Sequence, residues 1–313
     1  MFNPKHLFIA SILAILTVPQ AVTAQYANFS DYEIYSSVKT NPYPMANGIR
    51  EKRESLFKPN SRTAINSNGL SGYFVANTAE KLAEKQFILS SRYKFHKITS
   101  IKGQGLFSTE EGEVSSFDTS VTYVGKNSEI SATIPVQSWQ LSAPRTTGLM
   151  ADDDSGLGNI TFAYKYTGLE DHSYYRFALG VAATAKTGNS ERMTVSGSGK
   201  ETPTKLFGCV TTKETDRATG NLELGAIINK EDEDWFIYSL GFSYELTDHA
   251  SFIGEIAGEV AGSEEKDNMD MVMGVRIAPT QNINFEFAYY RNLRTYRAYG
   301  WDNQFQIGAT LQW

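Results

Sequence analysis

Two residues have the spacing of a catalytic base and a nucleophile, namely His249 and Ser251, which only Ala250 separates. In an extended strand, side chains two positions apart lie on the same face, so the imidazole could take the proton of the serine hydroxyl. Such a pair would suit ester hydrolysis. It belongs to a predicted turn, however, and no asparagine on a matching strand is placed to orient the histidine. Coincidence is therefore the simpler explanation.

The sequence offers little for metal, redox or cofactor chemistry. Cys209 is the only cysteine, which excludes an intramolecular disulfide and a cysteine metal site. His96 and His172 lack metal-ligand spacing, and the acidic run 152–154 is better explained as a solvated loop than as a cation site. We predict no catalytic residue, no cofactor and no metal. The net charge of −6 argues against nucleic acid as a partner.

A larger group of charged residues occupies alternate positions in segments that are otherwise apolar. If the apolar positions face lipid, these charges must face water or one another, and they would line the interior of a barrel. The candidate lumen residues are Arg92, Lys94, Asp118, Glu129, Lys165, Arg176, Glu223, Glu245, Glu255, Glu259, Asp270, Arg276 and Glu286. They would either select solutes or form ion pairs that support the interior. The acidic excess argues against a phosphate- or sulfate-selective pore.

The segments that carry these charges have the period of two that is typical of β-strands. In residues 235–246, for example, Phe236, Leu240 and Phe242 share one face, while Ser239 and Gly241 share the other. Twelve strands are predicted, at 86–97, 116–124, 127–137, 157–167, 174–187, 201–213, 218–229, 235–246, 251–261, 269–278, 283–293 and 303–313. The alternation is weakest in 201–213.

The connections between these strands alternate between short and mostly longer ones, as in bacterial outer-membrane barrels, which have an even number of strands. A soluble β-sandwich would alternate in the same way, but its strands are usually shorter. The expected fold is therefore an all-β, transmembrane, antiparallel up-and-down barrel of about 12 strands. Counting 98–107 as a strand would require a partner near 69–77 and give fourteen.

The two ends of the chain predict how it reaches a membrane. Residues 1–24 have a short basic start, an apolar run and a small-residue cleavage site, which together predict a secretory signal peptide. Residues 25–85 form a polar extension, either periplasmic or a plug in the lumen, in which 79–86 could form one or two helical turns. Residues 86–313 form the predicted barrel.

The last strand ends in an aromatic residue. Its apolar face serves as a candidate terminal insertion signal that the barrel-assembly machinery would recognise, and it comprises Phe305, Ile307, Leu311 and Trp313. Outer-membrane lipid and a small-molecule solute are the other expected partners. Interface girdles would use aromatic residues such as Tyr164, Tyr244, Trp235 and Trp301.

Three segments resemble a family of proteobacterial outer-membrane proteins named for a MetA pathway of phenol degradation. They are Ser155–Tyr166 (S-G-L-G-N-I-T-F-A-Y-K-Y), the strand end Ala185-Lys186-Thr187-Gly188, which lacks the family's proline, and Tyr238–His249. The resemblance extends over roughly residues 86–313. It implies an outer-membrane barrel that passes small, often aromatic, compounds, and it supplies no catalytic residues.

We accordingly expect a channel or transporter in the outer membrane of a Gram-negative cell, for small solutes that include hydrophobic or aromatic ones. Two alternatives remain open at this stage. One is a structural or adhesive barrel that transports nothing, and the other is an outer-membrane hydrolase that uses His249 and Ser251.

Overall fold

The computed structural model describes residues 65–101, 112–141, 152–169, 175–188, 203–213, 215, 217–228, 234–260, 268–295 and 299–313. The predicted signal peptide, residues 1–24, and residues 25–64 of the predicted extension lie outside the described residues. Within the described ranges, no helix is long and apolar enough to cross a membrane.

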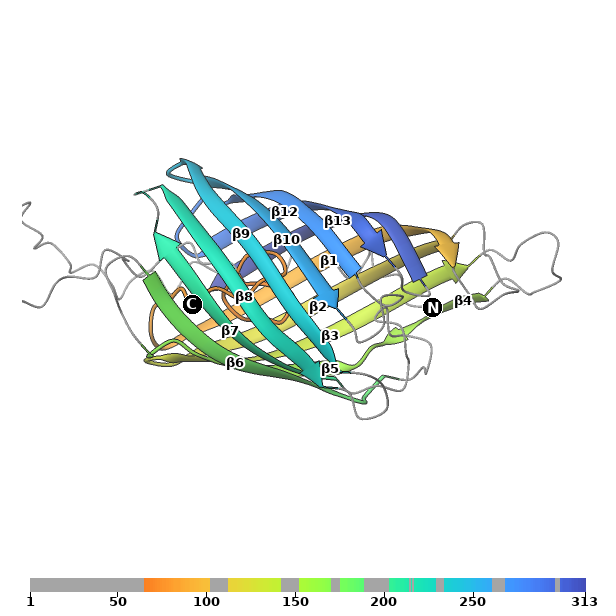
Figure 1. The fold of residues 1–313 in the computed structure, drawn as a ribbon, viewed down its shortest axis with the longest axis horizontal. Helices are drawn as coiled ribbons and strands as arrows, with labels where there is room; N and C mark the ends of the chain where they lie inside the picture. The colour runs from red at the N-terminus through yellow and green to blue at the C-terminus, as the bar shows by residue number, and fades with distance from the viewer. Residues whose placement is uncertain are drawn as a thin grey trace, which may run out of the picture.

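Strands make up almost all of the described structure (Figure 1). Their bounds are β1 Gln86–Ile101, β2 Gly112–Val124, β3 Ser128–Leu141, β4 Asp152–Leu157, β5 Ile160–Tyr166, β6 Tyr175–Ala185, β7 Thr204–Lys213, β8 Ala218–Ile228, β9 Trp235–Thr247, β10 Ala250–Val260, β11 Asn268–Ile277, β12 Ile283–Thr295 and β13 Tyr299–Gln312.

The strands close into a ring because β1 pairs with β2 on one side and with β13 on the other. All neighbours are antiparallel, and the order follows the sequence. Strands β4 and β5 both pair with β3, so together they occupy one strand position of the barrel, with an interruption between Leu157 and Ile160. The barrel thus has twelve strand positions, which is the predicted number. The fourteen-strand alternative is wrong, because Ile98–Ile101 continues β1 and residues 69–77 form no strand of the barrel.

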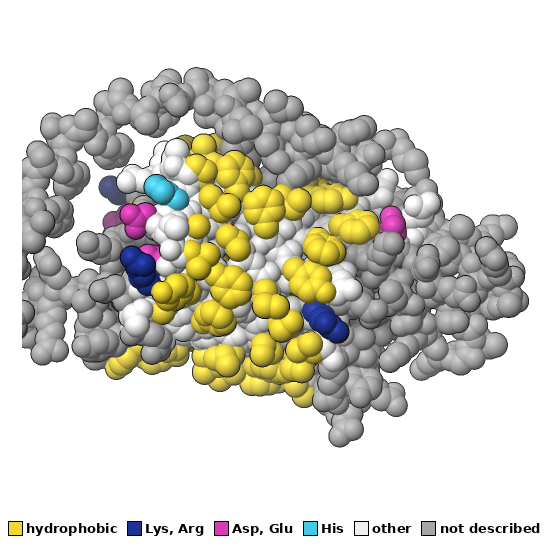
Figure 2. Space-filling model, turned by 90° about the horizontal axis from the view of Figure 1, so that it is seen from above, with side chains coloured by type: hydrophobic (Ala, Val, Ile, Leu, Met, Phe, Trp, Pro, Cys, Tyr) yellow, Lys and Arg dark blue, Asp and Glu magenta, His cyan; other side chains and the backbone are white. Residues whose placement is uncertain are grey.

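Side chains alternate between the two faces of the wall in the predicted register. On β9, Leu240 is 61% exposed and Phe242 is 51% exposed, whereas Ser239, the residue before Leu240, is 4% exposed. Apolar side chains cover the outer surface in a broad band, and the charged side chains in that view lie toward its ends (Figure 2). A surface of this kind suits a lipid environment, since it places apolar groups against acyl chains and polar groups inside.

The terminal strand follows the same rule. Phe305 and Ile307 are exposed on the outer face, Gln306 is buried on the inner face, and the ring of Trp313 stacks on Phe87 at a centroid distance of 6.5 Å. The girdle prediction is wrong for Trp235, because its side chain is buried on the inner face of the wall. The side chain of Trp301 lies outside the described residues.

One end of the barrel carries the short connections, among them 125–127, 248–249 and 278–282. The first residue of β1, Gln86, and the C-terminal Trp313 lie at this same end, where the Phe87 and Trp313 backbones exchange two hydrogen bonds of 3.0 Å. We call this the turn end. In bacterial barrels the short turns are periplasmic. The segment before β1 therefore reaches the barrel from the turn end.

Candidate functional site: a plugged barrel interior

Residues 65–85 form an irregular segment inside the barrel, which we call the plug (Figure 1). Its turns are held by internal bonds such as Asn66 N to Leu70 O at 2.7 Å, and by isolated bridges between Ile65 and Ser71 and between Gly72 and Asn77. The predicted helical turns at 79–86 are not formed. Residues 79–83 have no regular structure, residues 84–85 form a turn, and Gln86 already belongs to β1.

Carboxylates of the wall accept hydrogen bonds from the plug backbone. Glu129 on β3 accepts the Ser71 amide at 2.7 Å, and Glu223 on β8 accepts the Asn77 amide at 2.5 Å. Glu255 on β10 accepts three successive amides, those of Phe74, Val75 (3.2 Å) and Ala76 (3.1 Å). Converging backbone amides form an anion-binding concavity, so this turn of the plug is shaped around the Glu255 carboxylate.

Basic side chains of the wall donate to the plug carbonyls. Arg276 on β11 binds the Gly72 and Tyr73 carbonyls at 2.8 and 2.6 Å, and Lys165 on β5 binds those of Ser71 and Thr78 at 3.0 and 2.8 Å. Arg92 on β1 binds the Ile65 carbonyl. The charged wall residues thus bind main-chain atoms of the plug and fix its backbone path. Glu129 and Lys165 also bind the hydroxyl of Ser71.

The same wall charges also pair with one another. Lys165 lies 3.2 Å from Glu129, and Lys205 lies 2.5 Å from Glu223. Glu286 on β12 joins two cations, Arg92 at 2.5 Å and Arg276 at 3.4 Å. Apart from Lys205, whose side chain is 20% exposed, these groups are almost completely buried, and each charge has a partner of opposite sign, as burial of ions requires.

Apolar contacts complete the fit between plug and wall. Tyr73 and Phe74 pack in a buried cluster with Ile253, Val272, Ala288 and Tyr290. Their rings lie against inward-facing glycines, since a Cβ on Gly241 would come within 2.7 Å of the Tyr73 ring and one on Gly274 within 2.5 Å of the Phe74 ring. The guanidinium of Arg276 also lies 4.9 Å from the centroid of Phe74. These glycines provide the close approach that two large rings need.

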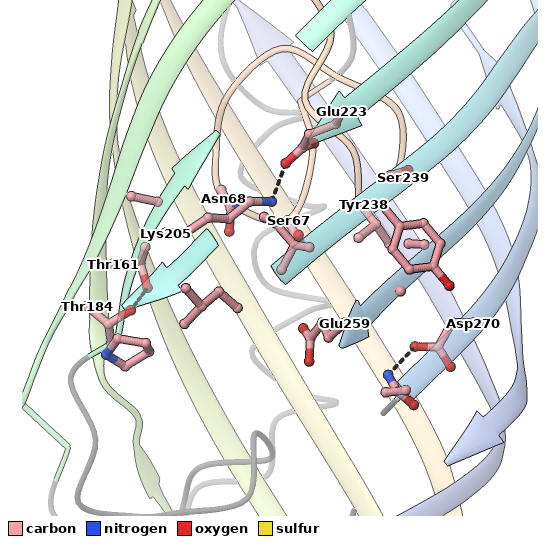
Figure 3. Close-up of a pocket in the computed structure, with 18 residues that line it drawn as sticks. Ser67, Asn68, Thr161, Thr184, Lys205, Glu223, Tyr238, Ser239, Glu259 and Asp270 are labelled. Atoms are coloured by element: carbon pink, nitrogen blue, oxygen red, sulfur yellow. Dashed lines mark hydrogen bonds and ion pairs between the residues drawn. The ribbon is translucent and has the colours of Figure 1, made fainter. Parts of the chain in front are cut away.

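A cavity of about 260 Å³ lies between the plug and the end of the barrel opposite the turn end (Figure 3). Its floor includes Ser67, Asn68 and Val75 of the plug. Its walls come from the far ends of strands β5 to β11 and from Pro203 just before β7, and they mix charged, hydroxyl and apolar groups: Thr161, Ala182, Thr184, Pro203, Lys205, Glu223, Ile227, Ile237, Tyr238, Ser239, Ala257, Gly258, Glu259, Asn268 and Asp270. We call this the outer cavity.

Three carboxylates border the outer cavity, on two sides of it. Lys205 is paired with Glu223, as the dashed line between them in Figure 3 shows. Glu259 and Asp270 lie on the opposite side of the cavity, where Asp270 accepts a hydrogen bond of 3.1 Å from the amide of Asn268. Ser239 is buried, and its hydroxyl has no hydrogen-bond partner among the described residues. The lining of the cavity therefore includes acidic, basic and hydroxyl groups.

The predicted lumen residues fall into several groups in the structure. Those that contact the plug or its immediate partners are Arg92, Glu129, Lys165, Glu223, Glu255, Arg276 and Glu286. Lys94 and Asp118 form a separate pair at 2.8 Å. Glu259 and Asp270 border the outer cavity, Arg176 is buried on β6, and Glu245 on β9 is partly exposed toward the turn end.

Sequence reasoning missed several inner residues. Lys205 and Thr211 lie on β7, the strand with the weakest alternation, and Asn221 is neutral. Thr211 accepts the Ala79 amide at 2.7 Å, and Asn221 donates to the Asn77 carbonyl at 3.0 Å. Alternate positions of each strand face the lumen. These residues could have been found by selecting every polar residue at such a position, and not only the charged ones.

The hydrolase pair is not assembled as a catalytic unit. His249 lies in the β9–β10 turn, and its Nδ1 is 3.2 Å from the Ala278 carbonyl oxygen. Within the described ranges, no hydrogen bond connects its ring to Ser251. The histidine thus contacts the backbone that follows β11.

Comparison with solved structures identifies the fold. An outer membrane channel from Pseudomonas putida F1 aligns with 77% of this chain and 100% of its own, at 12% identity and a TM-score of 0.63. The NanC porin (9% identity, 71% of this chain, 98% of its own) and the toluene transporter TbuX of Ralstonia pickettii (10%, 74% and 89%) align at TM-scores of 0.47 and 0.40. At these identities the likeness concerns the fold alone.

Comparison at the sequence level identifies the family. No curated protein matches the sequence. Residues 108–300, more than half of the chain, match the model of the family described as "Putative MetA-pathway of phenol degradation". This match includes β2 to β12 and the residues of the outer cavity from Thr161 to Asp270. The chain therefore belongs to that family.

Proposed function

We propose that this protein is an outer-membrane channel that takes up small solutes through its lumen. The proposal draws support from the closed ring with an apolar exterior, from a polar interior and from membership of the family. A cleaved signal peptide would bring the chain to the periplasm, and the barrel-assembly machinery would insert it with the help of Phe305, Ile307, Leu311 and Trp313.

The observation that carries the proposal is the outer cavity. It lies at the end of the lumen away from the short turns, and the plug forms its floor. A solute arriving from outside the cell would thus meet a chamber before it meets the plug. Enclosed chambers with a few placed polar groups are typical of small-molecule sites.

The lining of the cavity favours neutral or cationic solutes with an apolar body. Ile227, Ile237 and Val75 supply apolar surface, while Ser239 supplies a hydroxyl. Among the described residues of the lining, carboxylates outnumber basic side chains, which disfavours a free anion such as phosphate. Small phenols, which combine a ring with a hydroxyl group, suit this lining and agree with the description of the family.

The experiment is a flux and binding assay on the full-length protein. Proteoliposomes that contain it should admit 3-hydroxyphenyltrimethylammonium, a phenol whose permanent positive charge keeps it from crossing lipid, faster than empty liposomes do, and should exclude benzenesulfonate. Glu259→Gln together with Asp270→Asn should weaken the discrimination against the sulfonate. A channel would be excluded if the flux equalled that of empty liposomes for every solute, in the wild type and in the plug variants. That result would favour a structural or adhesive barrel.

The hydrolase alternative has its own readout. If His249 and Ser251 acted together, purified protein would cleave p-nitrophenyl esters, and Ser251→Ala would abolish that cleavage. Because the imidazole is bound to the Ala278 carbonyl, we expect no ester cleavage that depends on Ser251.

A further inference from the structure

We propose that the plug is the gate of the channel and that the Glu255 carboxylate is its latch. This inference rests on the channel function proposed above. In the closed state, which the structure shows, the amides of Phe74, Val75 and Ala76 hold the carboxylate. In the open state, the turn that carries these amides leaves Glu255, and water takes their place.

The plug extends across the lumen from wall to wall. It is bonded to β1 through Arg92, to β3 through Glu129, to β8 through Glu223 and to β11 through Arg276. These strands are distributed around the ring. A segment anchored on several sides stands in the path of any solute that moves from the outer cavity toward the turn end. Conduction therefore requires the plug to move.

Glu255 differs from Glu129, Glu223 and Glu286 in the partners that its carboxylate would keep after the plug leaves. Glu129, Glu223 and Glu286 each have a basic wall residue within 3.4 Å, so they keep a partner when the plug leaves. In the described part of the chain, the carboxylate of Glu255 has its hydrogen bonds from the plug amides alone. Its charge is therefore the one most closely coupled to the position of the plug.

The path of the chain allows such a movement. Ile65 at the start of the plug and Leu82 near its end pack together with Ile88 and Val124, which lie toward the turn end. The two ends of the plug as described, Ile65 and Leu82, thus lie close together and toward the turn end. A segment whose ends are held at the same side can move toward that side as one unit.

A disulfide can test the gate, because the chain has one native cysteine. Ala79 of the plug packs against Cys209 on β7 in a small buried cluster. In the Ala79→Cys variant, oxidation should join the plug to the wall. The matched control is Ala79→Cys combined with Cys209→Ala, which cannot form this bond.

The measurement is single-channel recording in planar bilayers before and after addition of dithiothreitol. We expect the oxidised variant to stay closed and the reductant to restore the openings of the wild type, while the control shows no response. Equal conductance in the oxidised and reduced states, with the disulfide verified by mass spectrometry, would show that solute passes a fixed plug and would overturn the gate.

The latch is tested by Glu255→Gln, with Glu245→Gln on the neighbouring strand β9 as the matched control. Hydrogen bonds to a charged group are stronger than those to a neutral one by an amount that corresponds to roughly 10-fold or more in an equilibrium constant. Glu255→Gln should raise the open fraction about 10-fold, and Glu245→Gln should leave it unchanged. An unchanged open fraction in Glu255→Gln would overturn the latch. Complete silence of every variant, reduced ones included, would instead count against the channel itself.

Discussion

Truncation of Phe74 gives the sharpest estimate of how firmly the plug is held. Phe74 is completely buried between the plug and the wall, and its ring lies against Arg276 and the face of Gly274. Replacement of a buried phenylalanine by alanine costs about 3–5 kcal/mol, and a desolvated cation–π contact contributes up to about 2 kcal/mol of such a loss. Since the ring contacts the wall only when the plug is docked, this cost falls on the docking equilibrium.

Phe74→Ala should therefore raise the undocked fraction of the plug by at least about 100-fold, at roughly 1.4 kcal/mol for each factor of ten. Hydrogen exchange of the amides of Val75 and Ala76, followed by mass spectrometry in detergent, measures this directly. Phe236→Ala is the control, because Phe236 lies on the outer face of β9 and is 50% exposed. Unchanged exchange in Phe74→Ala, with normal exchange elsewhere in the barrel, would refute the packing argument.

Three other predictions follow from the same contacts. Gly241→Val should displace the side chain of Tyr73 and speed hydrogen exchange of the plug amides. Gly254→Val should leave these amides protected, because a side chain at position 254 would meet the aromatic ring of Phe242 on the outer face of the barrel. Burial raises the pKa of the Glu80 carboxyl, so the docked plug binds a proton that the free segment has lost above the ordinary carboxyl pKa. The contribution of Glu80 to the docking free energy is therefore complete at acidic pH and is lost as the pH rises. Glu80→Gln should remove this pH dependence from the rate of amide exchange in the plug. Finally, the purified barrel should migrate faster on a detergent gel when it is not boiled, and identical mobility before and after boiling would argue against a closed ring.

The wall of the barrel could be predicted from the sequence because its two faces meet different solvents. Lipid on one side and polar groups on the other impose a period of two, which Leu240, Phe242 and their neighbours display. The same alternation identified most of the charged inner residues. It failed for Lys205, since Leu206 to Val210 forms a nearly continuous apolar run on β7. The girdle prediction for Trp235 came from its residue type and not from the alternation, which places residue 235 on the same inner face as Ser239.

The plug could not be predicted in the same way. Its contacts use main-chain amides and carbonyls, which every residue has, so the sequence of 65–85 carries no periodic signal. The three amides that bind Glu255 come from Phe74, Val75 and Ala76, residues that look like a short strand. The helix predicted at 79–86 is not formed, because Lys85 has a positive φ of 59° and donates its amide to the Val124 carbonyl, so the chain has already turned into β1 at Gln86.

Substituted-cysteine accessibility at two adjacent residues of β9 tests the central claim most directly. Ser239 lines the outer cavity, and Leu240 beside it is 61% exposed on the outer face. In a Cys209→Ala background within lipid bilayers, a charged, water-soluble thiosulfonate should modify Ser239→Cys and block the current, and it should leave Leu240→Cys unmodified. Modification of Leu240→Cys with protection of Ser239→Cys would place water outside the ring and contradict the account.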